Sequence, residues 1–264
     1  MLVLLVTQIV GSVLASVALH YQRRYNALHN SIYGLSYDTT LLSIVKSIVV
    51  LYTVLSYKFN PTVREQLYRR FPLFYNSWDD IPVSTPLLLA EGMLLISHLR
   101  IWRQMSLYKR TRHTHQGVSL IALIFLSVFL VVPAILTLYL SYFNIYHFAY
   151  LDHLNIMWVM GQIIGTMVLC SQICINWMGS CCAGVSSRSV MTMCAANAIR
   201  WLGYMFTIWA DSVDFWAWPF NATPVVVTSA ELLGLFIVFY QAQFIYFRHK
   251  PTLPKQSLRK STFV

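Results

Sequence analysis

Charged residues are scarce in this sequence of 264 residues: Asp, Glu, Lys and Arg together make up 11%, whereas hydrophobic residues make up 57%. In a typical soluble domain about a quarter of all residues are charged. So few charges cannot cover a water-facing surface, which excludes a soluble globular protein of ordinary composition. Acidic residues are the scarcest, nine against nineteen basic ones. This basic excess does not indicate nucleic-acid binding, because the basic residues sit at the ends of apolar runs, where they set membrane topology.

The sequence also lacks the motifs of most enzymes and metalloproteins. Its five cysteines all lie between Cys170 and Cys194, and a secreted disulfide framework would spread them more widely. Cys170 and Cys174 share a helix face, but no His or further Cys completes a metal site of four ligands at a familiar spacing. No nucleophile–base pair or glycine-rich phosphate loop is present. We therefore expect no enzyme, no cofactor and no metal.

Seven apolar runs are long enough to cross a bilayer as α-helices, which takes about 20 residues each. We therefore predict an all-α integral membrane protein with seven transmembrane helices. The first run resembles a signal peptide, but no basic segment precedes it and Arg23–Arg24 follow it directly, which favours a retained helix. The runs are Leu2–Tyr21, Thr39–Tyr57, Thr85–Met105, Val118–Phe143, His153–Trp177, Ser189–Ala210 and Val225–Phe247.

Basic residues are concentrated on one side of the predicted membrane. Only the loop after the second run opposes this pattern, with Lys58, Arg64, Arg69 and Arg70 offset by Glu65, Asp79 and Asp80. The positive-inside rule then places the N-terminus in the lumen and the C-terminal tail in the cytosol. The sequon that begins at Asn221 falls on the lumenal side and is a candidate glycosylation site. The loops after the first, third and fifth runs, with the tail, carry Arg23, Arg24, Arg103, Lys109, Arg110, Arg112, Arg188, Arg248, Lys250, Lys255, Arg259 and Lys260, whereas the loop after the sixth run has Asp211 and Asp214.

Two segments of the sequence repeat each other, and repeats decide architecture. Tyr21–Ser36 and Ser171–Ser186 each have Gln in second place and end in Gly-hydrophobic-Ser, and Ala90–Glu91 is echoed by Ala230–Glu231. We predict two parallel three-helix bundles joined by the fourth helix, with a site between them. The corresponding divisions are residues 1–108 and 149–248 for the repeats, 109–148 for the linking helix and 249–264 for a cytosolic tail. The repeated positions are Tyr21, Gln22, Gly34, Ser36, Ser171, Gln172, Gly184 and Ser186.

The two segments resemble the PQ-loop repeats of the cystinosin and lysosomal amino-acid exporter group, in which Pro-Gln is followed at a fixed spacing by Ser and Gly-hydrophobic-Ser. The resemblance implies a transporter of seven helices. Tyr21 and Ser171 stand where the family has Pro, so a hinge would have to come from elsewhere, such as Gly161 and Gly165. The position of the acid that proton-coupled members tend to carry corresponds here to Met193, so proton coupling through that site is not expected.

A second resemblance concerns Asn197 and Arg200, whose spacing after Gly184 is similar to an Asp and Lys pattern in PQ-loop proteins of the Golgi and endosomes. That branch is connected with phospholipid scrambling and with antagonism of lipid flippases. The endoplasmic-reticulum retrieval receptor is also similar in its seven helices and buried arginines, and it implies a sorting receptor.

Four ionisable residues fall inside the predicted spans, where charges are costly and mark functional candidates. Each triplet of helices has a base in its middle helix and an acid in its last: Lys46 with Glu91, and Arg200 with Glu231. One interpretation is an ion pair within each triplet that serves packing. The other is a polar path, shared with Asn197, that contacts a zwitterion or a lipid headgroup. Weaker candidates for this path are His98, Gln162, Asn176, Gln241 and Gln243.

Three functions are consistent with these features. The first is transport of a small polar or zwitterionic solute by rocking of the two bundles. The alternatives are a phospholipid scramblase or regulator of lipid asymmetry, and a seven-helix sorting receptor. We expect a lipid bilayer and a solute or phospholipid headgroup as partners, no nucleic acid, and a place in the Golgi, endosome, lysosome or vacuole rather than the plasma membrane.

Overall fold

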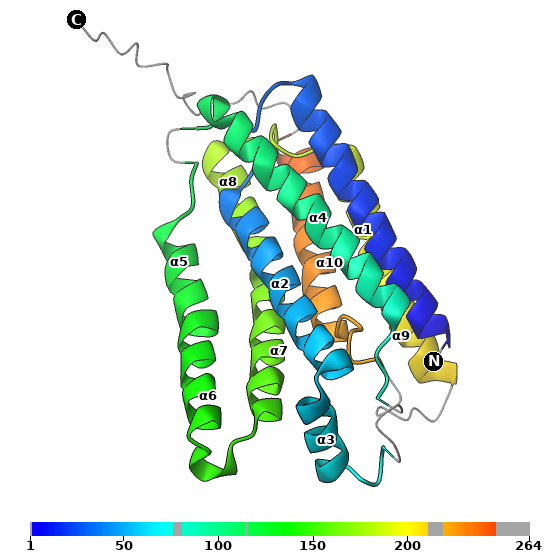
Figure 1. The fold of residues 1–264 in the computed structure, drawn as a ribbon. Coiled ribbons are helices and arrows are strands. Elements are labelled where there is room, and N and C mark those ends of the chain that lie inside the picture. The colour runs from blue at the N-terminus through cyan, green and yellow to red at the C-terminus, as the bar shows by residue number, and fades with distance from the viewer. Residues whose placement is uncertain (1, 76–80, 114–115, 211–218, 247–264) are drawn as a thin grey trace, which may run out of the picture.

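The computed structural model describes residues 2–75, 81–113, 116–210 and 219–246. Over these residues the chain forms helices and no extended strand, which confirms the all-α prediction (Figure 1). The helices are α1 (Leu2–Leu28), α2 (Tyr37–Phe59), α3 (Pro61–Arg70), α4 (Thr85–Leu107), η2 (Lys109–Thr111), α5 (Leu120–Leu126), η3 (Ser127–Val131), α6 (Val132–Tyr142), η4 (Ile145–His147), α7 (Tyr150–Met167), α8 (Cys170–Gly179), α9 (Ser187–Ala210), α10 (Val225–Tyr240) and η6 (Gln241–Ile245).

Five helices in the described part of the chain are long and apolar enough to cross a membrane. They are Leu2–Leu28, Tyr37–Phe59, Leu120–Tyr142, Tyr150–Gly179 and Val225–Ile245. This number of apolar helices is compatible with an integral membrane protein. The helices α4 and α9 are as long, 23 and 24 residues, but are not among these five because they are less apolar along their length.

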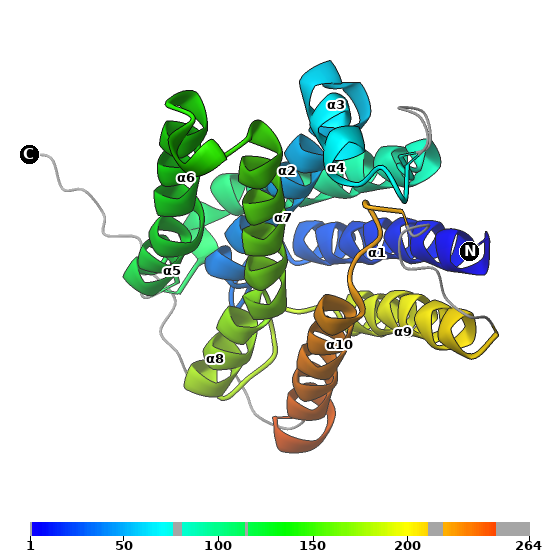
Figure 2. The same ribbon diagram turned by 90° about the horizontal axis from the view of Figure 1, so that it is seen from below.

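The long helices lie side by side, and we call α1, α2 and α4 the first triplet and α7 with α8, α9 and α10 the second triplet (Figures 1 and 2). In the first triplet α4 contacts both α1 and α2, and in the second α10 contacts both α9 and α7, which continues into α8. Between the triplets, α1 lies along α9 and α2 lies along α7. The first helix of each triplet therefore contacts the second helix of the other.

Small side chains allow α1 and α9 to approach closely. Ala15 and Ala18 are fully buried on α1, and a Cβ atom on Gly203 would lie only 1.9 Å from Thr7 Oγ1. Small residues let helix backbones come together in membrane proteins. The glycine on α9 therefore brings that helix against Thr7 of α1.

The helix that connects the triplets is formed by α5, η3 and α6 and lies at the edge of the molecule (Figure 2). The turn η3 is π-helical and directly precedes the part of α6 that contains Pro133. Proline has no backbone N–H and disturbs the hydrogen bonding of the preceding turn, which accounts for the irregular turn at this place. Side chains such as Ile121 and Ile135 are exposed, as expected for a surface in contact with lipid.

The fifth long helix is interrupted between α7 and α8, at Val168 and Leu169. Val168 N–H donates to the carbonyl of Gly165, three residues earlier, so the turn is tighter than an α-helix. The interruption directly precedes Ser171–Gln172, whereas α1 runs unbroken through Tyr21–Gln22. The two repeats therefore differ at the place where the PQ-loop family has proline.

The segment after α2 contains the amphipathic helix α3, where the sequence predicted only a loop. Its Val63 and Leu67 pack against Leu151 and Leu154 of α7, and Asn60 caps its start. Two of the basic residues that opposed the charge pattern are neutralised. Arg69 pairs with Glu65 at 2.6 Å, and Arg70 pairs with Asp152, whose hydrogen bond raises the pKa of Arg70.

Several expectations concern residues outside the described part of the chain. They are Asp79 and Asp80, Asp211 and Asp214 in the segment after α9, and the tail with Arg248, Lys250, Lys255, Arg259 and Lys260.

Candidate functional site: a polar cavity between the triplets

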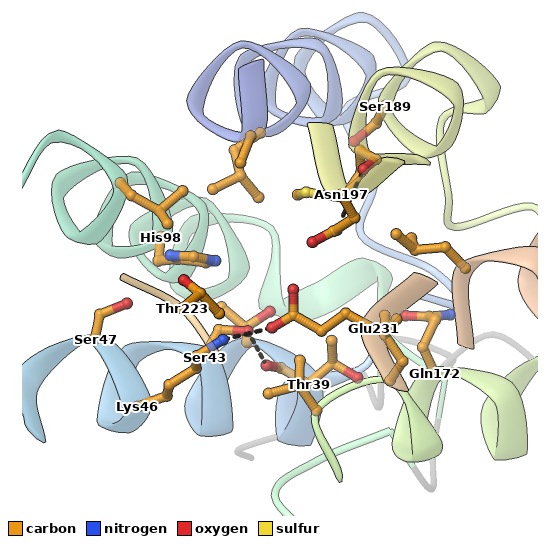
Figure 3. Close-up of a pocket in the computed structure, with 18 of the residues that line it drawn as sticks. Thr39, Ser43, Lys46, Ser47, His98, Gln172, Ser189, Asn197, Thr223 and Glu231 are labelled. Carbon is orange, nitrogen blue, oxygen red and sulfur yellow. Dashed lines mark hydrogen bonds and ion pairs between the residues drawn. The ribbon is translucent and has the colours of Figure 1, made fainter. Parts of the chain in front are cut away.

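A cavity of about 180 Å³ lies between the two triplets and is lined by side chains from both (Figure 3). All five residues proposed for a substrate path line it. So do His98 and Gln162, whereas Asn176 and Gln241 do not line it and Gln243 is exposed. The five path residues are Lys46, Glu91, Asn197, Arg200 and Glu231.

The first ion pair of the cavity joins Lys46 of α2 to Glu231 of α10. The distance from Lys46 Nζ to Glu231 Oε1 is 2.5 Å, and both side chains are largely buried. Figure 3 shows the two side chains pointing toward each other across the cavity. A Cβ atom on Gly165 would lie 3.0 Å from Lys46 Cε, so the glycine leaves room for the lysine to pass α7.

The second ion pair joins Arg200 of α9 to Glu91 of α4 through a hydroxyl group. Arg200 donates to Ser12 Oγ at 2.7 Å, and Ser12 donates to Glu91 Oε1, also at 2.7 Å. The direct distance from Arg200 to Glu91 is 3.9 Å. A Cβ atom on Gly11 would lie 2.5 Å from Arg200 Cγ, so Gly11 leaves room for the arginine beside α1.

The expected pairing within each triplet is therefore wrong, because each base pairs with the acid of the other triplet. The positions of base and acid along the helices were compatible with a pair, but depth does not fix which helices are neighbours. The arrangement is also symmetric, since Gly11 and Gly165 are as far apart in the chain as Lys46 and Arg200. Gly11, and Gly165 from the pair proposed as hinges, make room for the bases of the opposite triplet.

At one end of the cavity the two repeat motifs bind each other. Gln22 Nε2 donates to the carbonyl of Gly184 and Gln22 Oε1 accepts from Ser186 N–H, both at 2.9 Å. Gln172 makes the corresponding two bonds to Gly34 and Ser36, also at 2.9 Å. We call these six residues the glutamine clamp. A glutamine suits this role because its amide donates and accepts at once.

The backbones of the clamp cross in direct contact at its two glycines. A Cβ atom on Gly184 would lie only 2.2 Å from the carbonyl carbon of Gly34. The backbone of Gly34 itself has a φ of +79°, a left-handed conformation that favours glycine. The repeat motif of the sequence is thus explained by close approach and by reciprocal bonds. Tyr21 and Ser171, at the family's proline positions, make none of these bonds.

A second layer of amides supports each half of the clamp, and of these residues only Asn176 and Gln241 were predicted from the sequence, as candidates for the path. Gln22 also donates to Asn26, which donates to Gln104 at 3.4 Å. In the second triplet Gln172 donates to Asn176, which donates to Gln241 at 3.1 Å. The equal spacing from each Gln to its Asn was the signal in the sequence that could have revealed this layer.

At the opposite end, the segment 219–224 crosses between helices of both triplets, and we call it the strap. Asn221 Oδ1 accepts from Ser84 N–H at 3.2 Å, and Asn221 Nδ2 donates to the Ser84 carbonyl at 2.8 Å. Thr223 N–H donates to Gln8 Oε1, and Tyr204 donates to the Thr223 carbonyl. Asn221, Ala222 and Thr223 line the cavity.

The structure argues against the use of Asn221 as a glycosylation site in the folded chain. The side chain is buried, and its nitrogen, to which a glycan would be attached, is bonded to Ser84. A glycan at this atom would have to displace the strap.

Three buried oxygen atoms that belong to lining residues have no hydrogen-bond partner among the described residues. They are Thr39 Oγ1 of α2, Gln162 Oε1 of α7 and Asn197 Oδ1 of α9. Figure 3 shows Asn197 and the ring of His98 pointing into the cavity. Buried polar atoms are nearly always paired, so these atoms are available to water or to a ligand. Thr39 and Ser12 were not predicted from the sequence as members of this site.

Groups of three or more His, Cys, Asp or Glu placed to hold a metal do not occur in the described part of the chain.

No protein-family profile matches the sequence. The chain is similar to the uncharacterized protein YCL002C of Saccharomyces cerevisiae, with 36% identity over 266 aligned positions that cover 97% of this chain and all of the yeast protein. The chain belongs to the family of YCL002C. The alignment includes both triplets and the connecting helix, so the relationship with YCL002C concerns the whole architecture. YCL002C is uncharacterized, so the relationship assigns no activity to this chain.

Proposed function

We propose that this chain is a seven-helix membrane transporter that moves a small polar or zwitterionic solute through the cavity by rocking of the two triplets. The observation that carries the proposal is the polar cavity between the triplets, crossed by two ion pairs that each join one triplet to the other. Contacts of this kind can be made in one conformation and released in another, as alternating access requires.

Seven spans follow if α4 and α9 cross the membrane together with the five apolar helices. At 1.5 Å per residue each of these two helices is about 35 Å long, enough to cross the hydrocarbon core. Glu91 of α4 and Arg200 of α9 lower the mean hydropathy of their helices, yet both side chains are buried toward the cavity and not exposed to lipid. The exposed Arg100 and Arg103 lie in the last two turns of α4, near the end of the span.

The charge distribution supports a lumenal N-terminus and a cytosolic C-terminus. The clamp end of the bundle carries unbalanced basic residues, whereas Arg69 and Arg70 at the strap end are paired with acids. By the positive-inside rule the clamp end faces the cytosol and the strap faces the lumen. This arrangement suits a protein of the Golgi, endosome, lysosome or vacuole. The basic residues at the clamp end are Arg23, Arg24, Arg103, Lys109, Arg110 and Arg188.

The glutamine clamp supports the resemblance to PQ-loop proteins and the division into two parallel repeats. Both copies of the motif make the same bonds, each to the other copy. Each triplet also has its third helix in contact with its first two.

The size of the cavity favours a small solute over a whole lipid. Its volume of about 180 Å³ is below the roughly 300–1,000 Å³ of pockets that bury a drug-sized ligand. A phospholipid could place only its headgroup there. Scrambling, which the spacing of Asn197 and Arg200 suggested, is therefore the second candidate.

The test is reconstitution of the purified full chain into liposomes, with solute uptake and lipid scrambling measured in parallel. Radiolabelled lysine, threonine and erythritol represent cationic, zwitterionic and uncharged solutes, and a fluorescent phosphatidylcholine reports scrambling. We expect uptake of at least one solute, lost at least tenfold in Arg200→Gln and kept in Ile135→Ala, a change on the exposed face of α6.

Scrambling without solute uptake would support the lipid function instead. If the folded protein does neither, the transport proposal fails and a receptor that binds a peptide tail in the cavity becomes the better explanation.

A further inference from the structure

We infer that the solute is uncharged and is recognised by the neutral oxygen atoms of Thr39, Gln162 and Asn197, while the four cavity charges hold the triplets together. This inference rests on the proposed transport function and names the chemical class of the solute. It also separates the five residues of the substrate path into two roles, since Asn197 contacts the solute and the four charged residues do not.

The four charges of the cavity are already paired with one another, each base with one acid. Lys46 is bonded to Glu231 at 2.5 Å, and Arg200 reaches Glu91 through Ser12 by two bonds of 2.7 Å. Two bases and two acids give these residues no net charge. A zwitterion that used its own charges would first have to separate at least one pair in a buried environment, where each separated charge loses its partner.

Several buried atoms of the cavity lining lack a hydrogen-bond partner among the described residues. Two are nitrogens, Arg200 Nε and His98 Nδ1, and three are oxygens of neutral side chains. Thr39 Oγ1, Gln162 Oε1 and Asn197 Oδ1 come from α2, α7 and α9, so both triplets contribute to them.

Gly161, beside Gln162, packs on Val49, which lies about 15 Å along α2 from Thr39. A small solute therefore meets these atoms in turn along its path. A buried acceptor without a partner is unfavourable, and a ligand that donates to it removes this cost. Hydroxyl or amide N–H groups on an uncharged solute can supply such donors.

The orientation of Asn197 strengthens the assignment. Its Nδ2 donates to the Met193 carbonyl one turn earlier at 3.3 Å, which directs Oδ1 away from its own helix. Figure 3 shows the side chain pointing into the cavity, on the side opposite Lys46. The amide therefore offers an acceptor to the solute and is not free to rotate and offer a donor. Ser43 Oγ, which donates to the Thr39 carbonyl, keeps its acceptor capacity beside Thr39.

The cavity volume of about 180 Å³ limits the solute to a few hydrogen-bonding groups, because pockets for drug-sized ligands measure roughly 300–1,000 Å³. Erythritol, a four-carbon polyol, and threonine, a zwitterion with the same number of non-hydrogen atoms, are matched probes. They differ mainly in charge, so their comparison isolates the feature under test.

The experiment measures uptake of each probe at equal concentration into liposomes that contain the full chain. We expect erythritol uptake to exceed threonine uptake at least tenfold. Asn197→Leu and Gln162→Leu, which remove acceptors at similar volume, should each lower erythritol uptake at least fivefold, while Ile135→Ala should not. Melting temperatures of the purified variants establish that they are folded.

A second variant tests the role of the charges. In Lys46→Met/Glu231→Gln the pair is replaced by neutral side chains of similar size, and we expect erythritol uptake to stay within fivefold of the parent. Loss of uptake in this variant while it remains folded would assign the charges to solute binding and overturn the inference. Uptake of threonine without erythritol overturns it too but leaves the transport function in place, and uptake of no probe overturns both.

Discussion

Lys46 and Glu231 form a buried pair that can be tested by charge reversal. Lys46→Glu alone places two carboxylates together and leaves no base beside Glu231. Breaking a buried pair in this way costs about 3–5 kcal/mol, so we expect a clearly lower melting temperature in detergent. The double change Lys46→Glu/Glu231→Lys restores an opposite pair and should recover most of the loss.

The matched control exchanges Lys46 with the acid of its own triplet. In Lys46→Glu/Glu91→Lys the new lysine would face Arg200 through Ser12, so no recovery is expected. Equal recovery by the two exchanges would contradict the crossed pairing.

At the scale of residues, sequence reasoning could identify the cavity side chains but not their partners. Lys46 and Arg200 stand out because an ionisable group in an apolar run is costly. Their partners depend on which helices are neighbours, and periodicity along a helix carries no such information. Ser12 was overlooked for a related reason, since a serine on a helix of small residues is typical of packing.

The glutamine clamp is the feature of the helix ends that best explains the repeated motif, and it predicts a shared loss of stability. Gln172→Ala leaves the Gly34 carbonyl and Ser36 N–H without their partner, which costs about 1–3 kcal/mol for each buried group. Gln22→Ala should cost a similar amount at Gly184 and Ser186.

The measurement is the melting temperature of the two single variants and the double variant. Because the glycine backbones touch, we expect the loss in the double variant to be smaller than the sum of the single losses. Gln243→Ala, at an exposed glutamine of η6, is the matched control and should change little. Losses that add fully would show that the two halves of the clamp act independently.

At the scale of elements, hydropathy predicted the long helices, but it did not predict the short helix α3 or the interruption between α7 and α8. Apolar runs and their lengths predict helices directly. The helix α3 was missed because its stability comes from packing of Val63 and Leu67 on α7, a contact between distant parts of the chain. The break before Cys170 was foreseen only as a hinge near Gly165, since the sequence gives no proline there.

For the whole molecule, the clamp and the strap lie at opposite ends of one cavity, and both join the triplets. The clamp is built from reciprocal bonds between equivalent segments, whereas the strap is a single segment held by Ser84, Gln8 and Tyr204. The sequence predicted the repeat behind this arrangement, but it could not show the strap, whose residues are distant in the chain from their partners.

Alternating access requires each end to open in turn, so a covalent link between the triplets at either end should stop transport. Ser84→Cys/Asn221→Cys joins α4 to the strap, and Tyr25→Cys/Ala183→Cys joins the triplets at the clamp end, where Tyr25 donates to the Ala183 carbonyl at 2.9 Å. In a background without the native cysteines, we expect a short bifunctional thiol crosslinker to lower solute uptake at least tenfold in each pair. Glu65→Cys/Arg69→Cys, within the exposed turn of α3, should react without loss of uptake. A crosslinked pair that still transports would show that its end of the cavity does not need to open, and it would replace rocking of the triplets with movement at the other end alone.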